Sequence, residues 1–174
     1  MHYEIERKWM VDGEPPAELK LVLCKDEEME QGYISVHPAV RIRREANMAL
    51  EHEAAVVSVK HMLCFKSAGG LKRMETEWEI PEEKYLLLRE MIGLPMIKKR
   101  RKTYSLENGL YLEVNVVDAG RPEAFQYAEV EFETVEAARS WRPTGMLAYY
   151  LSDEVTGQKG SSMGEYWMET RMLK

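Results

Sequence analysis

The sequence has few of the residues that disulfide frameworks, thiolate metal sites and membrane helices require. Only two cysteines, Cys24 and Cys64, occur in 174 residues, too few for a disulfide framework or a cysteine zinc site. Both stand in apolar runs, and we expect them to be small core residues. No apolar run approaches the roughly 18 residues of a membrane helix. Charge enters by Glu4, so we expect no signal peptide, no membrane contact and a cytoplasmic location.

An excess of basic charge is also missing. The formal net charge is −6 at pH 7, which argues against a nucleic-acid partner, because such partners need a basic face. No Gly-rich phosphate loop is present, so any phosphate ligand must be held by side chains. The hydrophobic share of 45% and charged share of 31% are typical of a globular chain. We expect one domain over residues 1–174.

Short segments of alternating polarity dominate the chain. They predict strands at residues 3–11, 31–36, 39–45, 56–67, 71–80, 97–105, 110–117 and 127–133. Helical patterns and start signals predict helices at 15–27, 82–92, 135–141 and 163–173. Many short strands with a few helices predict an α+β fold, in which helices pack outside an antiparallel sheet or barrel.

Turn and capping residues separate these segments. Gly69-Gly70 and Asn108-Gly109 are typical of turns between paired strands. Thr134 is placed to cap the helix after it. Ser162 and Glu165 have the spacing of a capping box, which predicts the start of the last helix.

One face of almost every predicted strand is charged. In the first strand, Glu4, Glu6 and Lys8 alternate with apolar residues. A solvated sheet face is the simplest explanation for any single strand. Across the whole set, however, acids lie beside acids and bases beside bases at i, i+2, and such neighbours repel unless a ligand neutralises them. The complete pattern therefore favours a closed barrel whose charged faces line one cavity.

The residue types indicate the ligands that such a cavity would hold. Carboxylate oxygens are hard donors that suit Mg²⁺ or Mn²⁺. Lysine and arginine side chains hold phosphate oxygens, arginine often through two hydrogen bonds. Phosphoryl transfer depends mainly on positioning and on neutralising charge. A metal-bound polyphosphate would satisfy both kinds of side chain.

Several motifs together resemble the CYTH superfamily, the triphosphate tunnel metalloenzymes. Glu4-Ile5-Glu6-Arg7-Lys8 matches the ExExK signature, and Arg41-Ile42-Arg43 matches RxR. The remaining matches follow in the family's order: Glu30 to Ser35 (second strand), Phe65 to Glu77 (K…RxExE hairpin), Lys99 and Arg101 (KxR), Glu129 to Phe132 (ExE) and Glu154 to Thr156. The resemblance covers residues 3 to about 157, most of the chain.

The resemblance implies a closed eight-stranded antiparallel barrel that forms a tunnel and uses divalent metal to hydrolyse a triphosphate. It implies metal binding by Glu4, Glu6, Glu129 and Glu131, to which we add Glu77 and Glu113. It implies phosphate binding by Lys8, Arg41, Arg43, Lys66, Arg73, Lys99 and Arg101, with Glu75 as a further substrate contact. Lys8, Glu6 and Arg41 are the predicted catalytic residues. Mg²⁺ or Mn²⁺ is the expected cofactor, and inorganic triphosphate the leading substrate.

Two departures from the family pattern leave alternatives open. Asn115 stands where relatives often have an acid, and an amide is a weaker metal ligand, so a second metal is an open question. The segment 157–174 lacks the usual acidic-Arg-Tyr continuation, and Lys159 stands one position from the missing base. A class IV adenylyl cyclase, a thiamine triphosphatase and a non-catalytic polyphosphate-binding module are the alternative functions. The sequence does not settle the oligomeric state, and a homodimer stays open.

Overall fold

The computed structural model describes residues 2–51 and 55–173. Its strands are β1 (Tyr3–Met10), β2 (Val22–Ser35), β3 (Ala39–Met48), β4 (Val56–Lys66), β5 (Lys72–Glu79), β6 (Ile97–Ser105), β7 (Tyr111–Val117), β8 (Phe125–Glu131) and β9 (Asp153–Glu154). Its helical segments are η1 (Ala17–Leu19), α1 (Glu82–Ile92), η2 (Glu107–Gly109), α2 (Val135–Ser140), α3 (Gly145–Tyr150), α4 (Met163–Trp167) and the π-helical η3 (Met168–Met172). No described helix is both long enough and apolar enough to cross a membrane.

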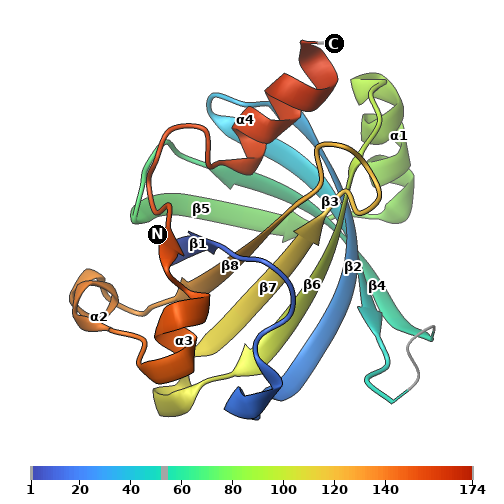
Figure 1. Ribbon diagram of the computed structural model, residues 1–174. Helices are drawn as coiled ribbons and strands as arrows, with labels where there is room; N and C mark the ends of the chain where they lie inside the picture. The colour runs from blue at the N-terminus through green and yellow to red at the C-terminus, as the bar shows by residue number, and fades with distance from the viewer. Residues whose placement is uncertain (1, 52–54, 174) are drawn as a thin grey trace.

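The strands close into an antiparallel barrel, as predicted. Their order is β5-β4-β3-β2-β6-β7-β8-β1, and a pairing between β5 and β1 closes the ring of eight. This closing pairing is short: it runs from Tyr3 opposite Met74 to Ile5 opposite Lys72. Further along β1, the same edge is completed by β9, with Trp9 opposite Glu154. The barrel is thus continuous, and β1 holds its two ends together (Figure 1).

Side-chain polarity is inverted relative to a barrel that carries an apolar ligand. Glu4, Glu6 and Lys8 point inward, whereas Ile5 and Trp9 of the same strand are buried on the outside. The apolar cluster around Trp9 lies on the outer side of the barrel wall. The second cluster also reaches the cavity, because Tyr33, Tyr127 and Met163 belong to it and line the cavity. Burial of these two clusters supplies the hydrophobic contribution to stability.

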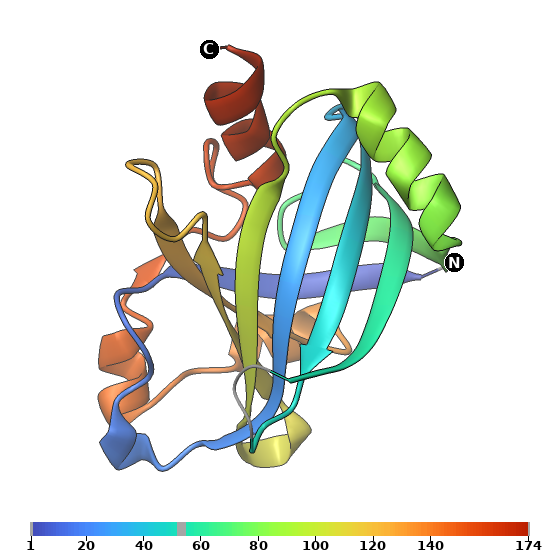
Figure 2. The ribbon, with the colours of Figure 1, turned by 90° about the vertical axis from the view of Figure 1, so that its right-hand side faces the viewer.

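The helices cover separate parts of the outer wall. Helix α1 packs on β2, β3 and β4, and buries Tyr85 against them. Helix α2 packs on β1, and α4 contacts β2. Helices α1 and α4 lie toward one end of the barrel, and α2 and α3 lie toward the other (Figures 1 and 2).

Several predicted signals are confirmed locally. Thr134 caps α2 by accepting from the Ala137 amide, and Ser162 with Glu165 forms the capping box of α4. The turn between β4 and β5 requires glycine at Gly69, because a Cβ there would lie 2.6 Å from the Lys72 carbonyl oxygen. The helix predicted at 163–173 is present, although its second half is π-helical.

Two predictions were wrong. Residues 15–27 are not a helix: only Ala17–Leu19 form a 3-10 turn, which ends at a left-handed Lys20, and β2 begins at Val22. The apolar stripe there reflects one turn followed by a strand, and pairing with β6 decides the conformation. Cys24 is exposed rather than a core residue, and it lies at the register shift between Leu23 and Lys25 in the pairing of β2 with β6, whereas Cys64 is buried as expected.

Candidate functional site

The barrel encloses a charged cavity of about 970 Å³. Every residue that the sequence analysis assigned to a metal, phosphate or catalytic role lines this cavity. They come from β1 and β3 to β8, because an inward-facing residue recurs at every second position of each strand. The architecture therefore brings together side chains that are up to about 127 positions apart in the chain, from Glu4 to Glu131.

One side of the cavity is an ion-pair network between β1, β4 and β5. The Glu4 carboxylate accepts from Lys66 Nζ at 2.7 Å and from Arg73 Nε at 2.6 Å. Arg73 also donates to Glu6 at 2.7 Å, and Lys66 lies 3.2 Å from Glu75. Burial would raise the pKa of Glu4, but Lys66 and Arg73 outweigh it and hold that pKa far below its usual value. These charges largely neutralise one another.

Three further cations of the cavity have no direct ion pair with a described residue, although carboxylates such as Glu129 lie near enough to influence them. Lys8, Arg41 and Lys99 form no ion pair with any residue in the described ranges. The Nε atoms of Arg41 and Arg43 are buried without a hydrogen-bond partner among the same residues. Burial lowers the pKa of Lys8, and burial together with Arg101 lowers that of Lys99. An anion in the cavity would supply the missing partners.

Carboxylates gather next to these cations on β1, β7 and β8. Glu6 faces Glu131 across the β1–β8 pairing, and Glu113 faces Glu129 across the β7–β8 pairing. Burial and the neighbouring Glu129 and Glu4 raise the pKa of Glu6 to about 8. Burial and Glu4 also raise the pKa of Glu131. Arg73 pairs with Glu6, and Arg101 lies near Glu113 and Glu129. The raised pKa values of Glu6 and Glu131 nevertheless indicate that protein groups do not fully compensate the negative charge of these two carboxyls.

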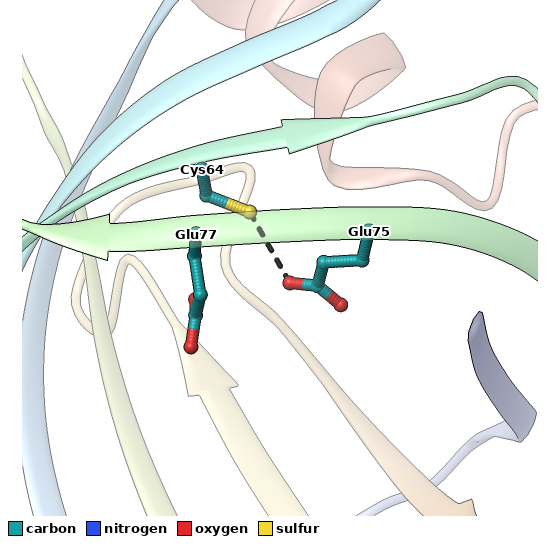
Figure 3. A group of neighbouring side chains, drawn as sticks. All are labelled: Cys64, Glu75 and Glu77. Carbon is teal, nitrogen blue, oxygen red and sulfur yellow. Dashed lines mark hydrogen bonds between the residues drawn. The ribbon is translucent and has the colours of Figure 1, made fainter. Parts of the chain in front are cut away.

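Figure 3 shows a separate group of possible ligand atoms on β4 and β5. Cys64 Sγ donates to Glu75 Oε1 at 3.2 Å, and Glu77 lies beside them. Within the described part of the chain, no other three such residues have all their ligand atoms within 4.8 Å of one another. Lys66 and Arg43 already pair with the two carboxylates, at 3.2 and 3.5 Å. This group is therefore already compensated by protein charges.

Asn115 departs from the role that the sequence suggested. Its side chain is fully buried and does not line the cavity. Its Oδ1 accepts from Arg101 Nε at 3.0 Å, and its Nδ2 donates to the Glu113 carbonyl. The Asn115 amide thus contacts a cavity arginine directly.

The charge pattern missed two contributors to the cavity. Tyr127 lines it and contacts both Lys8 and Lys99. The loop before α4 also lines it, and Ser161 accepts from Lys8 Nζ at 2.6 Å through its carbonyl oxygen. Strand alternation could have revealed Tyr127, because it lies two positions before the inward-facing Glu129. The loop before α4 gave no signal in the sequence.

Comparison with known proteins agrees with this geometry. No family model matches the chain. An inorganic triphosphatase of Nitrosomonas europaea is 28% identical over 159 residues, which cover 90% of this chain and 91% of that protein. The crystal structure of an inorganic triphosphatase has a TM-score of 0.59 at 23% identity, with 97% of this chain and 96% of that one covered. The predicted resemblance to the triphosphate tunnel family is confirmed.

Two further solved structures share the fold of this chain. The PH1819 protein of Pyrococcus horikoshii has a TM-score of 0.63 at 20% identity, covering 97% of this chain and 99% of that one. A Hippeastrum protein, first taken for an adenylyl cyclase and described as having a dominant triphosphatase activity, has a TM-score of 0.55 at 18% identity. That match covers 95% of each chain. These likenesses concern the fold.

Proposed function

We propose that this protein hydrolyses a small-molecule triphosphate, and that inorganic triphosphate is its substrate. The observation that carries the proposal is a set of cavity cations, the half-buried Lys8 and the buried Arg41 and Lys99, that form no direct ion pair with a carboxylate of the described residues. A polyphosphate chain offers several anionic oxygens in a row, which such a set can bind together. The 28% identity to an inorganic triphosphatase supports the choice of substrate.

In this proposal the chain's own residues position the phosphates. Arg41, Arg43, Lys99 and Arg101 hold the phosphate chain, and Lys8 contacts the terminal phosphoryl group. Lys66, Arg73 and Glu75 fix the opposite wall through their ion pairs. Water attacks the terminal phosphorus as the bridging P–O bond breaks, which yields phosphate and pyrophosphate. The cations stabilise the charge that shifts to the leaving pyrophosphate.

The carboxylate side fits a divalent metal. Mutual repulsion of Glu6, Glu129 and Glu4 already raises the pKa of Glu6, and a cation would relieve this repulsion. We assign Mg²⁺ or Mn²⁺ to Glu6, Glu113, Glu129 and Glu131, which offer only hard oxygen donors. Glu4 pairs with two cations, Lys66 and Arg73, and Glu77 lies on β5 and pairs with Arg43, so we give both an indirect role. Glu6 and Glu113 each pair with one arginine, Arg73 and Arg101. When bound, the metal would supply further neutralisation of phosphate oxygens.

One assay separates the candidate activities. The protein is incubated with triphosphate, thiamine triphosphate or ATP and Mg²⁺, and phosphate, pyrophosphate and cyclic AMP are measured. Phosphate release that is fastest from triphosphate supports the proposal. Cyclic AMP from ATP would replace it with a cyclase, and faster release from thiamine triphosphate with a thiamine triphosphatase. Binding without any product would leave a polyphosphate-binding module.

The metal assignment has its own test. Glu129→Gln and Glu131→Gln should abolish turnover that depends on Mg²⁺ while the far-ultraviolet circular dichroism stays unchanged. Glu133→Gln is a matched control, since Glu133 follows the same strand and does not line the cavity. Wild-type rates in both site variants at saturating Mg²⁺ would contradict the assignment.

We also propose a cytoplasmic homodimer that covers the outer face of β5. Trp78, Met74 and Tyr3 are 54%, 46% and 40% exposed there. Lys72 lies at one end of this outer face of β5, and Glu82 and Glu83 follow its other end. A two-fold axis would place the basic end of one copy beside the acidic end of the other. Sedimentation should give a dimer for the wild type and a monomer for Trp78→Glu. A wild-type monomer would refute the dimer.

A further inference from the structure

Tyr127 lies between two cavity lysines and contacts both. Its ring is under the Lys8 ammonium, with Nζ 4.0 Å from the ring centroid. Its hydroxyl accepts from Lys99 Nζ at 3.3 Å. The side chain is 1% exposed, and the ring of Phe125 lies 5.8 Å from its ring at an interplanar angle of 25°. One rigid side chain therefore touches two ammonium groups from β1 and β6.

We propose that Tyr127 is a positioning residue that fixes Lys8 and Lys99 for phosphate binding without neutralising either charge. A π face and a hydroxyl oxygen both attract an ammonium group, and neither carries a formal charge. Lys8 Nζ also donates to the Ser161 carbonyl oxygen, which is neutral as well. Both lysines are thus held in place while their charge stays available to an anion.

On the opposite wall, a lysine is held by carboxylates instead of by neutral groups. Lys66 is fixed by the Glu4 and Glu75 carboxylates at 2.7 and 3.2 Å. Those ion pairs hold the lysine equally well, but they use its charge, and a phosphate would have to compete with two carboxylates. A cavity with that arrangement on all sides would bind an anion weakly. Tyr127 therefore accounts for the difference between the two walls, and predicts that the phosphates bind nearer to β6 and β8.

The two halves of the side chain can be tested separately. Tyr127→Phe keeps the ring under Lys8 and removes the oxygen that accepts from Lys99. Tyr127→Leu removes both contacts. Phe125→Leu is the matched control, because it removes an aromatic ring from the same cluster but does not line the cavity. The inference rests on the proposed function for its ligand, so the first readout is independent of any phosphate.

That readout is the proton NMR spectrum of the lysine side chains without ligand. The Cε protons of Lys8 should be shifted upfield by the ring current of Tyr127, with their assignment made through Lys8→Arg. Tyr127→Phe should keep this shift, and Tyr127→Leu should return the signals to the range of solvent-exposed lysines. Phe125→Leu should keep it. Signals of Lys8 that are the same in wild type and Tyr127→Leu would overturn the inference.

The second readout is calorimetric binding of inorganic triphosphate with Mg²⁺, together with steady-state kinetics. Affinity should fall from wild type to Tyr127→Phe to Tyr127→Leu, by roughly tenfold or more in the last step, as expected for a desolvated cation–π contact. The loss should be larger in KM than in kcat, because the phosphate chain is held less well. Triphosphate affinity and KM in Tyr127→Leu equal to those of Phe125→Leu would overturn the inference.

The two readouts distinguish failure of the proposed function from failure of the proposed role of Tyr127. If wild type binds no triphosphate but shows the Lys8 shift, the proposed function fails and phosphate positioning by Tyr127 fails with it. If wild type binds and hydrolyses triphosphate but lacks the shift, the proposed function stands and the role of Tyr127 is refuted. Should Tyr127→Leu not fold, Tyr127→Phe decides: unchanged triphosphate affinity and KM would remove Lys99 from the inference and overturn it as stated.

Discussion

The pKa of Glu6 shows how a charged interior affects the stability of the protein. Its pKa is raised to about 8 by burial and by Glu129 and Glu4, against 4.5 for an ordinary glutamate. The folded protein therefore binds this proton more tightly than the unfolded chain. The contribution of Glu6 to stability is complete below pH 4.5 and is lost as the pH rises toward 8.

Glu6→Gln should remove this dependence on pH. Without divalent metal, we expect the variant to match wild type near pH 4.5 and to exceed it at pH 8.5 by at least about 1 kcal/mol. Urea unfolding at several pH values, with a chelator present, measures the difference. A wild type that is equally stable relative to Glu6→Gln at both pH values would contradict the assignment.

Asn115 gives a second prediction at the residue scale. An aspartate there would form a buried ion pair with Arg101, whose Nε already donates to Asn115 at 3.0 Å. The pair would draw the arginine charge away from the cavity. We expect Asn115→Asp to weaken triphosphate binding about tenfold, the order of one charged hydrogen bond, without lowering the Mg²⁺ concentration for half-maximal rate. A reduced Mg²⁺ requirement would instead return Asn115 to the metal site.

Residue positions in the cavity were predictable where a charge repeated at every second position. Arg41 and Arg43, or Glu129 and Glu131, show this pattern directly in the sequence. The pairing between charges was not predictable, because Lys66 and Glu4 meet only through barrel closure. Tyr127 was missed because an aromatic residue in a strand is usually a core residue, and only the inward face distinguishes it.

At the scale of elements, the C-terminal helical segment is tied to the barrel by a buried ion pair. Arg171 Nη2 lies 2.7 Å from Asp118 Oδ2, and both side chains are almost fully buried. Tyr166 donates to the same carboxylate oxygen at 2.7 Å, and hydrogen bonding to Asp118 adds to burial in raising the pKa of Tyr166 to about 12. This cluster holds α4 and η3 at the end of the barrel.

Removing one member of the Arg171–Asp118 ion pair should lower the free energy of unfolding. Arg171→Met leaves the Asp118 charge buried without its partner, and we expect a loss of roughly 3–5 kcal/mol in the free energy of unfolding. Asp118→Asn combined with Arg171→Met removes both charges and should cost less than the single variant. Urea denaturation of the three proteins provides the comparison. A double variant as unstable as the single one would show that packing, rather than charge, anchors the segment.

The helix wrongly predicted at residues 15–27 shows which kind of element the local sequence could not predict. Leu19, Val22 and Leu23 have helical spacing, and the two prolines are a valid helix start. A distant partner determines the conformation here, because residues Val22 to Gln31 of β2 pair with β6. The other strands carried their own alternation, so their assignment did not depend on distant partners.

At the scale of the whole molecule, the many cations predict a dependence on phosphate length. Each additional phosphate reaches further along the row of cavity bases, so affinity should rise from phosphate to pyrophosphate to triphosphate. Higher ionic strength should weaken binding less than it weakens contacts between exposed charges. Calorimetry with the three anions checks this. Equal affinities would contradict a cavity that binds the chain along its length.

The closing strand of the barrel has a consequence for synthesis on the ribosome. β1 is made before the other strands, yet its partners are β5 and β8, and Glu6 lies opposite Glu131. On the ribosome, only the short pairing with β5 is available to β1 until residues near 131 have emerged, so most of the strand stays unpaired until then. Because Glu4, Glu6 and Lys8 form one face of that strand, charge keeps it hydrated during the wait. The side chains that line the finished cavity would thus also protect the nascent chain from aggregation.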